Sequence, residues 1–284
     1  MTGARVTATL MLAVIGFIAG CQSPPSVLTA DRPTINQYMK TPAVLVFSRT
    51  LGWRHDEGIA GADLFFARLT TEREFGLFTT ENPRVFNSED LSRFDLVVFN
   101  NVTGASLDPK QRAAFENWMR AGGAWIGLHG AGDGSMSDWR WYQNNLIDTR
   151  FIGHTMAPQF QTGTLARLSS EHPIVDNLPD RWSQTDEWYS FNRIPAPPGA
   201  ILLVGIDESS YTPHNLVVDR WPRDLRMGAS VFDHPLIWAI CQPEYRGFYS
   251  ALGHSFETYD NPIYRQLLSN AVDWVMASDS PECD

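Results

Sequence analysis

The residues of this sequence that are best suited to chemistry are histidines placed near the ends of apolar runs. His55 lies in a polar segment, His129 directly follows the run 124–128, and His254 follows the run 247–252. Imidazole titrates near neutral pH, so these side chains could act as general acid and base. Two imidazoles and a carboxylate are also a common ligand set for catalytic zinc, with one position left for water or a carbonyl oxygen. The alternative is that they are core histidines bonded to the backbone.

Acidic and aromatic residues form a second group of candidates. Glu187 stands directly before Trp188 and Tyr189, and a carboxylate beside aromatic rings suits sugar recognition. Its oxygens bind hydroxyl groups while a ring face packs on the apolar face of the sugar. The alternative is an exposed acid next to core aromatics. Trp53, in a loop, is the first candidate for stacking on a sugar, and Asp133 could act as an acid or orient a histidine.

The elements that must position these side chains alternate between strands and helices. Apolar runs and helical periodicity predict, in order, strand 43–48, helix 56–73, strands 76–80 and 95–100, a helix from Pro109 to the glycines at 122 and 123, strands 124–128, 200–206 and 247–252, and helix 262–276. This alternation is typical of a parallel sheet covered by helices on both faces. Such sheets bind ligands beyond the carboxyl ends of the strands, where the segments 48–56, 100–104 and 129–133 fall.

Six short motifs, in a fixed order, resemble a known family. They are Val44-Leu-Val-Phe-Ser48 with Gly52-Trp-Arg-His55, Asp95-Leu-Val-Val-Phe99, Ala121-Gly-Gly-Ala-Trp-Ile-Gly-Leu-His129, Asp186-Glu187-Trp-Tyr189, His234-Pro235-Leu-Ile-Trp238 and Gly253-His254. Over residues 42–277 the chain resembles the trehalose-utilisation (ThuA-like) family. The resemblance implies a fold similar to class I glutamine amidotransferases, a flavodoxin-like three-layer α/β sandwich with a mostly parallel central sheet. It also implies a role in sugar catabolism, particularly of 3-keto disaccharides and glucosides.

The comparison with amidotransferases tests the mechanism. Those enzymes place a nucleophilic cysteine on the turn after a central strand and pair it with a histidine on a later strand. Here the matching turn carries His129 and the later strand ends in His254, while Cys241 and Cys283 lie in no such turn, so glutaminase chemistry is rejected. We expect His129 and His254 to meet at the ends of adjacent strands.

The expected catalytic residues are therefore His129, His254, Glu187 and His55, and His129 and His254 are the expected ligands if a divalent metal such as zinc is bound. His154 matches a position near the pocket of the family and joins Trp53, Asp133, Trp188 and Tyr189 as expected substrate-binding residues.

The first twenty residues predict an export signal. They hold one charge, Arg5, before an apolar stretch too short for a comfortable membrane span, and Ile18-Ala-Gly-Cys21 resembles the lipobox of bacterial lipoproteins. This implies cleavage before Cys21 and lipidation of that residue, with 21–41 as a linker and 278–284 as a tail. The protein would then be anchored in the cell envelope, at the outer membrane or its periplasmic side in a host with two membranes. The alternative is an ordinary cleaved signal with an incidental cysteine.

Composition excludes other classes of function. With 22 basic and 32 acidic residues, the formal charge is −10, which disfavours a nucleic-acid partner. A bridge between Cys241 and Cys283 is not the favoured expectation, and the cysteines form no zinc-cluster pattern. We therefore expect an exported carbohydrate-active enzyme, a sugar hydrolase, lyase or isomerase, whose partners are a small carbohydrate and the membrane. The alternative is a surface sugar-binding module without catalytic activity.

Overall fold

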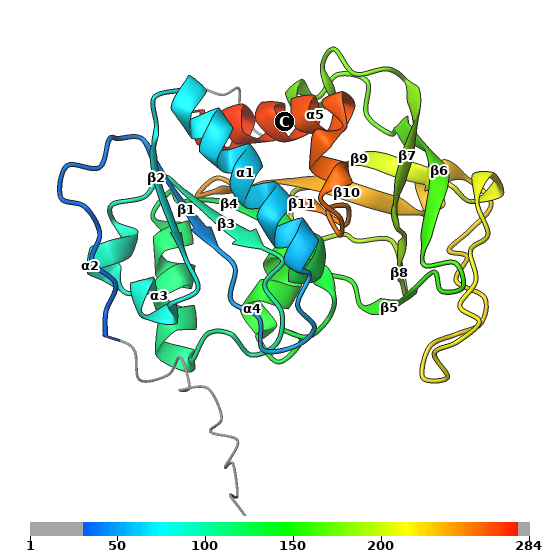
Figure 1. The fold of residues 1–284 in the computed structure, drawn as a ribbon, viewed down its shortest axis with the longest axis horizontal. Coiled ribbons are helices and arrows are strands. Elements are labelled where there is room, and N and C mark those ends of the chain that lie inside the picture. Colours follow the sequence, from blue (N-terminus) through cyan, green and yellow to red (C-terminus); the bar gives the residue numbers. More distant parts are fainter. Residues whose placement is uncertain (1–30, 278–284) are drawn as a thin grey trace, which may run out of the picture. The chain divides into compact units, whose positions relative to one another are not determined.

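The computed structural model describes residues 31–277, which fold around one large sheet (Figure 1). Its strands are β1 (Ala43–Phe47), β2 (Gly76–Thr80), β3 (Leu96–Asn100), β4 (Ala124–Leu128), β6 (Phe160–Arg167), β7 (Arg181–Glu187), β9 (Ala200–Asp207), β10 (Pro235–Cys241) and β11 (Arg246–Ser250). Among these residues the sheet has the order β2-β1-β3-β4-β11-β10-β9-β6-β7, and β5 (Phe151–His154) pairs separately with β8 (Tyr189–Phe191).

The first five strands of the sheet are mutually parallel, as the alternating pattern predicts. Every residue of β1, β3 and β4 is buried, which explains why these strands appear in the sequence as continuous apolar runs. The register pairs Asn100 with Leu128 and Leu128 with Ser250, so β3, β4 and β11 end side by side. One edge of the sheet therefore collects the segments that follow these strands.

Helices cover both faces of the sheet and complete a three-layer α/β sandwich (Figure 1). The helices are α1 (Asp56–Glu72), α2 (Ser88–Leu91), α3 (Pro109–Arg120), α4 (Arg140–Tyr142) and α5 (Pro262–Met276). Helix α3 begins with a capping box, in which Asp108 accepts from the backbone of Lys110 and Gln111. The apolar side of α5, including Leu267, Leu268 and Ala271, is buried, as its spacing predicts.

The antiparallel half of the sheet departs from the prediction. Strands β10, β9, β6 and β7 run alternately, and only β9 lies where the sequence analysis places a strand. β6 and β7 are rich in Thr, Gln and Arg, and β7 alternates between exposed and buried residues, so neither forms an apolar run. This half matters for function because β7 ends at Glu187.

The packing of the domain begins before residue 42, where the sequence analysis places its boundary. Arg32 forms an ion pair with Asp90, and Ile35 is buried in the core, so part of the expected linker contacts the domain. Cys241 is disulfide-bonded. The other two cysteines, Cys21 and Cys283, lie outside the described residues, as does the expected export signal. None of the helices in the described part has the length and apolar character needed to span a bilayer.

Candidate active site

Two histidines lie at the shared edge where the parallel strands end. His129 directly follows β4, and His254 lies four residues beyond the end of the neighbouring strand β11. Their rings are 5.0 Å apart between centroids, and Nε2 of His129 lies 3.1 Å from Nδ1 of His254. The expectation that these two side chains meet at the ends of adjacent strands is confirmed.

The backbone around His129 is unusual and is held from several sides. His129 has φ of 43°, a left-handed conformation that is strained for a residue with a side chain. Its carbonyl accepts a hydrogen bond from the hydroxyl of Tyr249 at 2.8 Å. Its ring Nδ1 lies 2.7 Å from the carbonyl oxygen of Ala251. Since a carbonyl only accepts, Nδ1 carries a hydrogen, and Nε2 is the ring atom that faces His254 and Glu187.

His254 is placed by a buried carboxylate beneath its own turn. Oδ1 of Asp186 accepts from the backbone N–H of Glu187 at 2.8 Å and of His254 at 3.3 Å. Oδ2 accepts from the N–H of Gly253 at 2.9 Å and the hydroxyl of Thr258 at 2.9 Å. Burial raises the pKa of Asp186, against the influence of nearby His129 and of these donors. Asp186 therefore fixes the turn that carries His254 and the strand end that carries Glu187.

Gly253 is required at this turn for two reasons. Its φ is 116°, which side chains with a Cβ rarely adopt, and a Cβ would lie 2.4 Å from the hydroxyl of Tyr259. The close approach brings the His254 turn against the helical segment Glu257–Asp260.

Glu187 joins the two histidines in a compact triangle. Its Oε2 lies 3.3 Å from Nε2 of His129 and 3.1 Å from Nδ1 of His254. Its Oε1 lies 3.1 Å from Nδ1 of His154 and accepts from Nε2 of Gln159 at 2.5 Å. Burial opposes ionisation of Glu187, but the hydrogen bonds with His129 and His254 outweigh it and hold its pKa well below the usual range. Burial lowers the pKa of His129, but Glu187, Asp186 and the carbonyl of Ala251 together raise it by more.

His55 completes the cluster from a third loop. It is the residue before α1, yet its side chain does not cap that helix and lies against the other two histidines instead. Its ring stands nearly perpendicular to His129 and to His254, with centroids 4.6 Å and 4.7 Å away. Burial lowers the pKa of His55 to about 2, with the neighbouring histidines acting in the same direction. Its Nδ1 is buried without a hydrogen-bond partner.

The four side chains fit a divalent metal of the zinc type. One ligand atom from each of His55, His129, Glu187 and His254 lies within 4.8 Å of the others. Bonds of about 2.0–2.1 Å in a tetrahedral site place ligand atoms about 3.3–3.4 Å apart. The measured edges of the triangle are 3.1, 3.1 and 3.3 Å. The bond from His129 Nδ1 to a carbonyl is the kind of outer contact that orients a ligating imidazole.

The expected substrate-binding residues divide into exposed and buried ones. Trp53 is 73% exposed, so its ring is free to contact a ligand, and His154 borders Glu187. Asp133 is half-buried and accepts from the N–H of Ser135, and burial raises its pKa. The substrate-binding roles of Trp53, His154 and Asp133 stay predictions.

Trp188 and Tyr189 need correction. Trp188 is 1% exposed and packs near Gly163 and Tyr211, so it offers no ring face to a sugar. Tyr189 is also 1% exposed, and its ring lies 4.3 Å from the ring of His129. Both are core aromatics, and Tyr189 supports a histidine of the cluster rather than a substrate.

Three residues near the cluster were missed in the sequence. Asp186 stands in one of the six motifs, but the aromatic residues after Glu187 single out Glu187 and not Asp186 as the site residue. Gln159 and Phe160 contact Glu187 and His254, and they lie at the start of a strand with no apolar run to reveal it. Their places depend on the pairing of β6 with β7, which local sequence does not specify.

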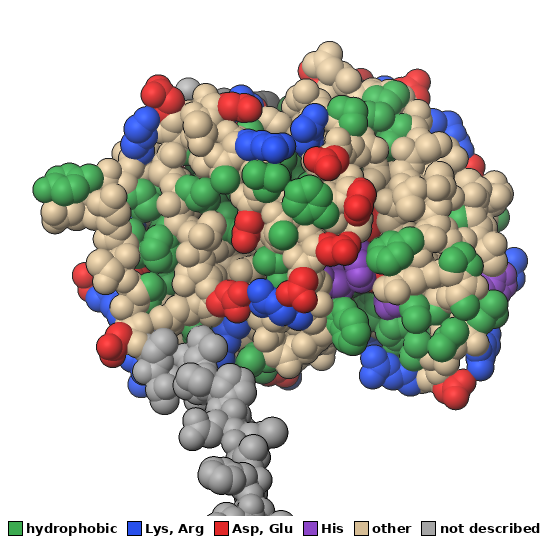
Figure 2. Space-filling view, viewed as in Figure 1, with side chains coloured by type: hydrophobic (Ala, Val, Ile, Leu, Met, Phe, Trp, Pro, Cys, Tyr) green, Lys and Arg blue, Asp and Glu red, His purple; other side chains and the backbone are tan. Residues whose placement is uncertain are grey.

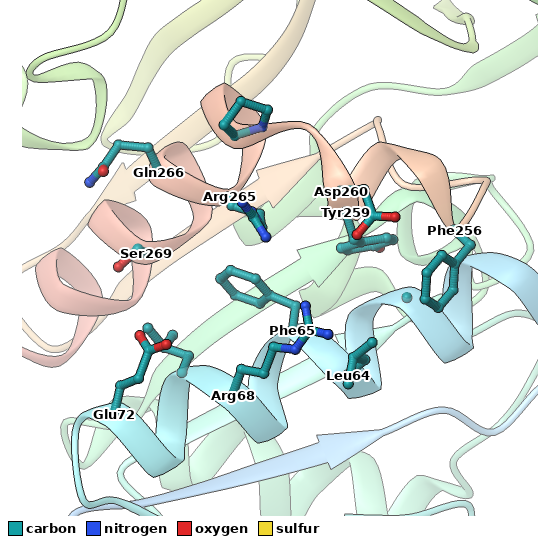
Figure 3. A pocket seen from close by; sticks show the side chains of 13 residues that line it. Leu64, Phe65, Arg68, Glu72, Phe256, Tyr259, Asp260, Arg265, Gln266 and Ser269 are labelled. Carbon is teal, nitrogen blue, oxygen red and sulfur yellow. The ribbon is translucent and has the colours of Figure 1, made fainter.

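A second concave feature lies away from these histidines. A groove of about 440 Å³ runs between α1 and α5, with Arg68 and Arg265 on its sides and Phe65 at its floor (Figure 3). In contrast, the histidine cluster reaches the surface at His154 and His254, whose side chains are each 14% exposed. Figure 2 shows histidine at the surface with hydrophobic side chains beside it.

Comparisons with known proteins agree with this architecture. The family model described as ThuA, trehalose utilisation, matches residues 43–275. A ThuA-like protein from Bacteroides uniformis is 22% identical, with a TM-score of 0.71 over 87% of this chain and 96% of its own. A ThuA-like protein from Parabacteroides merdae is 16% identical, with a TM-score of 0.60 over 86% of this chain and 92% of its own. At these identities the two structures establish the fold alone. No protein of curated function matches the sequence.

Proposed function

The chain belongs to the trehalose-utilisation (ThuA) family, and from this premise we propose that it is an exported, lipid-anchored enzyme that acts on a sugar or glycoside. The family itself indicates a sugar-related role. The proposed chemistry is acid–base catalysis at a divalent-metal site, and the proposed substrates include 3-keto derivatives of glycosides. The geometry of the histidine cluster supports this reading.

One observation carries the proposal. Nε2 of His129, Nδ1 of His254 and Oε2 of Glu187 face one another at 3.1–3.3 Å. Lone pairs this close repel unless a proton or a cation lies between them. Burying these charged and polar side chains costs solvation free energy, so such a cluster would be unfavourable if it served only to fill the core. The close contact of these three atoms therefore favours a site that holds an ion or moves a proton.

His129 and His254, together with Glu187 or His55, would hold the metal, and zinc suits their nitrogen and carboxylate donors. When bound, such an ion acts as a Lewis acid toward a carbonyl oxygen or water. The chain itself supplies the orientation: Ala251 fixes the tautomer of His129, and Asp186 fixes the turn of His254. A 3-keto group acidifies the adjacent C–H bond, and whichever of His55 and Glu187 does not bind the metal would accept that proton. Isomerisation or elimination would follow, and hydrolysis is a further outcome.

The direct test of this function is turnover of a panel of 3-keto glycosides, including 3-keto-trehalose, by the protein with and without added zinc. We expect consumption of at least one member, and we expect His129→Ala to lower the rate by about a hundredfold or more, because positioned acid–base groups contribute about 10²–10⁴. His172→Asn is the matched control, since His172 caps the short helix Pro173–Val175 and lies outside the cluster.

If the wild type leaves every member of the panel unchanged under both conditions, the proposed enzyme activity is wrong. Saturable sugar binding without turnover would instead indicate a sugar-binding module. Equal rates for the wild type and His129→Ala would show that His129 takes no part in the reaction.

Anchoring is tested separately in a bacterial host that expresses the full chain. We expect the wild type in the membrane fraction and released by detergent, because several acyl chains together hold a soluble domain at a bilayer. Cys21→Ser, which removes the proposed lipidated sulfur, should move the protein into the soluble fraction. Ser23→Ala, two residues away, should stay with the membrane. A wild type found in the soluble fraction, or a Cys21→Ser variant that remains membrane-bound, would contradict the anchor.

A further inference from the structure

Among the described residues of the histidine cluster, His154 and His254 are the most exposed to solvent. The side chains of His154 and His254 are each 14% exposed, whereas those of His129 and Glu187 are 0% and 1% exposed. An aromatic ring stands against each exposed histidine. Phe160 lies 4.9 Å from His254, and Trp221 lies 4.4 Å from His154, both with steeply inclined planes. A ligand that approaches the cluster therefore passes aromatic side chains.

Phe160 is the more open of the two rings. It is 42% exposed, while Trp221 is half-buried and has the guanidinium of Arg220 5.4 Å from its ring. The register of β6 and β7 pairs Phe160 directly with Glu187. Side chains of directly paired residues lie on the same face of a sheet, so the ring of Phe160 stands beside the Glu187 carboxylate. A single exposed aromatic residue needs no explanation, but one that pairs with Glu187 and lies against the ring of His254 does.

The residue before Phe160 adds a polar partner. Nε2 of Gln159 must be the atom that faces Glu187, because a carboxylate only accepts hydrogen bonds. The amide oxygen Oε1 of Gln159 is therefore directed away from Glu187, and no described residue donates to it. This leaves a hydrogen-bond acceptor next to the exposed ring and the cluster.

We propose that Phe160 and Oε1 of Gln159 form the first sugar subsite, in which the apolar face of a pyranose ring stacks on Phe160 and one of its hydroxyls donates to Gln159. This inference rests on the proposed function and names the part of the substrate that the site recognises. An aromatic ring and an acceptor beside it match the two sides of a pyranose, an apolar face of C–H groups and a rim of hydroxyls. An acyclic polyol has the same hydroxyls but no such face. Phe160 thus selects for the ring, and Gln159 orients it toward Glu187 and His254.

The test is equilibrium binding of trehalose, methyl α-glucoside and sorbitol to the full domain, measured by ligand-observed NMR. We expect both ring sugars to bind the wild type, and Phe160→Leu to weaken both by about two- to tenfold, because the substitution removes the stacking face. Phe160→Trp keeps a stacking surface and should retain both affinities, which guards against a loss caused by misfolding. Tyr38→Leu, an exposed aromatic at the start of the domain before β1, is the control and should bind as the wild type does.

Three results would overturn the subsite: no binding of either ring sugar to the wild type, unchanged affinity in Phe160→Leu, or an equal loss for sorbitol and the ring sugars. Binding needs no turnover, so the two proposals fail separately. Ring binding that depends on Phe160, in a protein that consumes no keto sugar, would keep the subsite and reject the enzyme.

Discussion

Replacing His129 by alanine is expected to lower the affinity of the protein for zinc by about a hundredfold or more. Nε2 of His129 lies 3.1 Å from Nδ1 of His254 and 3.3 Å from Oε2 of Glu187, so the substitution removes one corner of the ligand triangle. Apparent binding free energies of about 10–16 kcal/mol, divided among four ligands, give roughly 3 kcal/mol for each. Each 1.4 kcal/mol is about tenfold in the dissociation constant. Titration against a zinc chelator of known affinity measures the change.

The control for zinc binding is His172→Asn, which alters a histidine that contacts Trp274 instead of the cluster. It should bind zinc as tightly as the wild type. A wild type with no measurable zinc affinity, or a His129→Ala variant that binds equally well, would show that the cluster holds protons only. In that case the acid–base reading of the same residues would remain, because it depends on the hydrogen bonds of Glu187 and not on an ion.

The parallel half of the fold could be predicted from the sequence because its signals are local. β4 is found at residues 124–128 and α5 at 262–276, as expected, since fully buried strands and amphipathic helices leave continuous or periodic apolar patterns. β6 and β7 could not be predicted in this way. Their residues meet across an antiparallel pairing, and a polar strand at that position has no run or period to distinguish it from a loop.

The residues of the candidate site likewise divide into those that local sequence predicts and those that depend on strand pairing. His129 and His254 could be brought together from the sequence because each follows a strand of the parallel half, and adjacent strands end at one edge. Trp188 was expected near a substrate because it follows Glu187, but successive residues around a strand point to opposite sides. The ring of Trp188 therefore enters the core while the carboxylate of Glu187 faces the histidines. Phe160 belongs to the site only through its pairing with Glu187.

Asp186→Asn is expected to destabilise the fold by about 1–3 kcal/mol and to weaken zinc binding by about tenfold or more. Both carboxylate oxygens of Asp186 accept from backbone N–H groups, Oδ1 from Glu187 and His254 and Oδ2 from Gly253. The amide group of asparagine must replace one of these oxygens, so its NH₂ would face a backbone donor whichever way it is turned. A buried donor without an acceptor costs about 1–3 kcal/mol. Because the same bonds place His254 and Glu187, zinc affinity should fall as it does when outer partners of metal ligands are changed.

Asp63→Asn is the control for loss of a half-buried carboxylate elsewhere in the fold. Asp63, on α1, accepts one side-chain hydrogen bond, from Nδ2 of Asn100 at 3.0 Å, and an asparagine at position 63 can keep that bond through its own oxygen. Urea unfolding should therefore show a small change for Asp63→Asn and a large one for Asp186→Asn, and zinc titration should rank the two variants in the same order. If Asp186→Asn unfolds at the same urea concentration as the wild type and binds zinc equally well, the turn of His254 is held by its own glycine geometry and by Tyr259, and Asp186 does not position it.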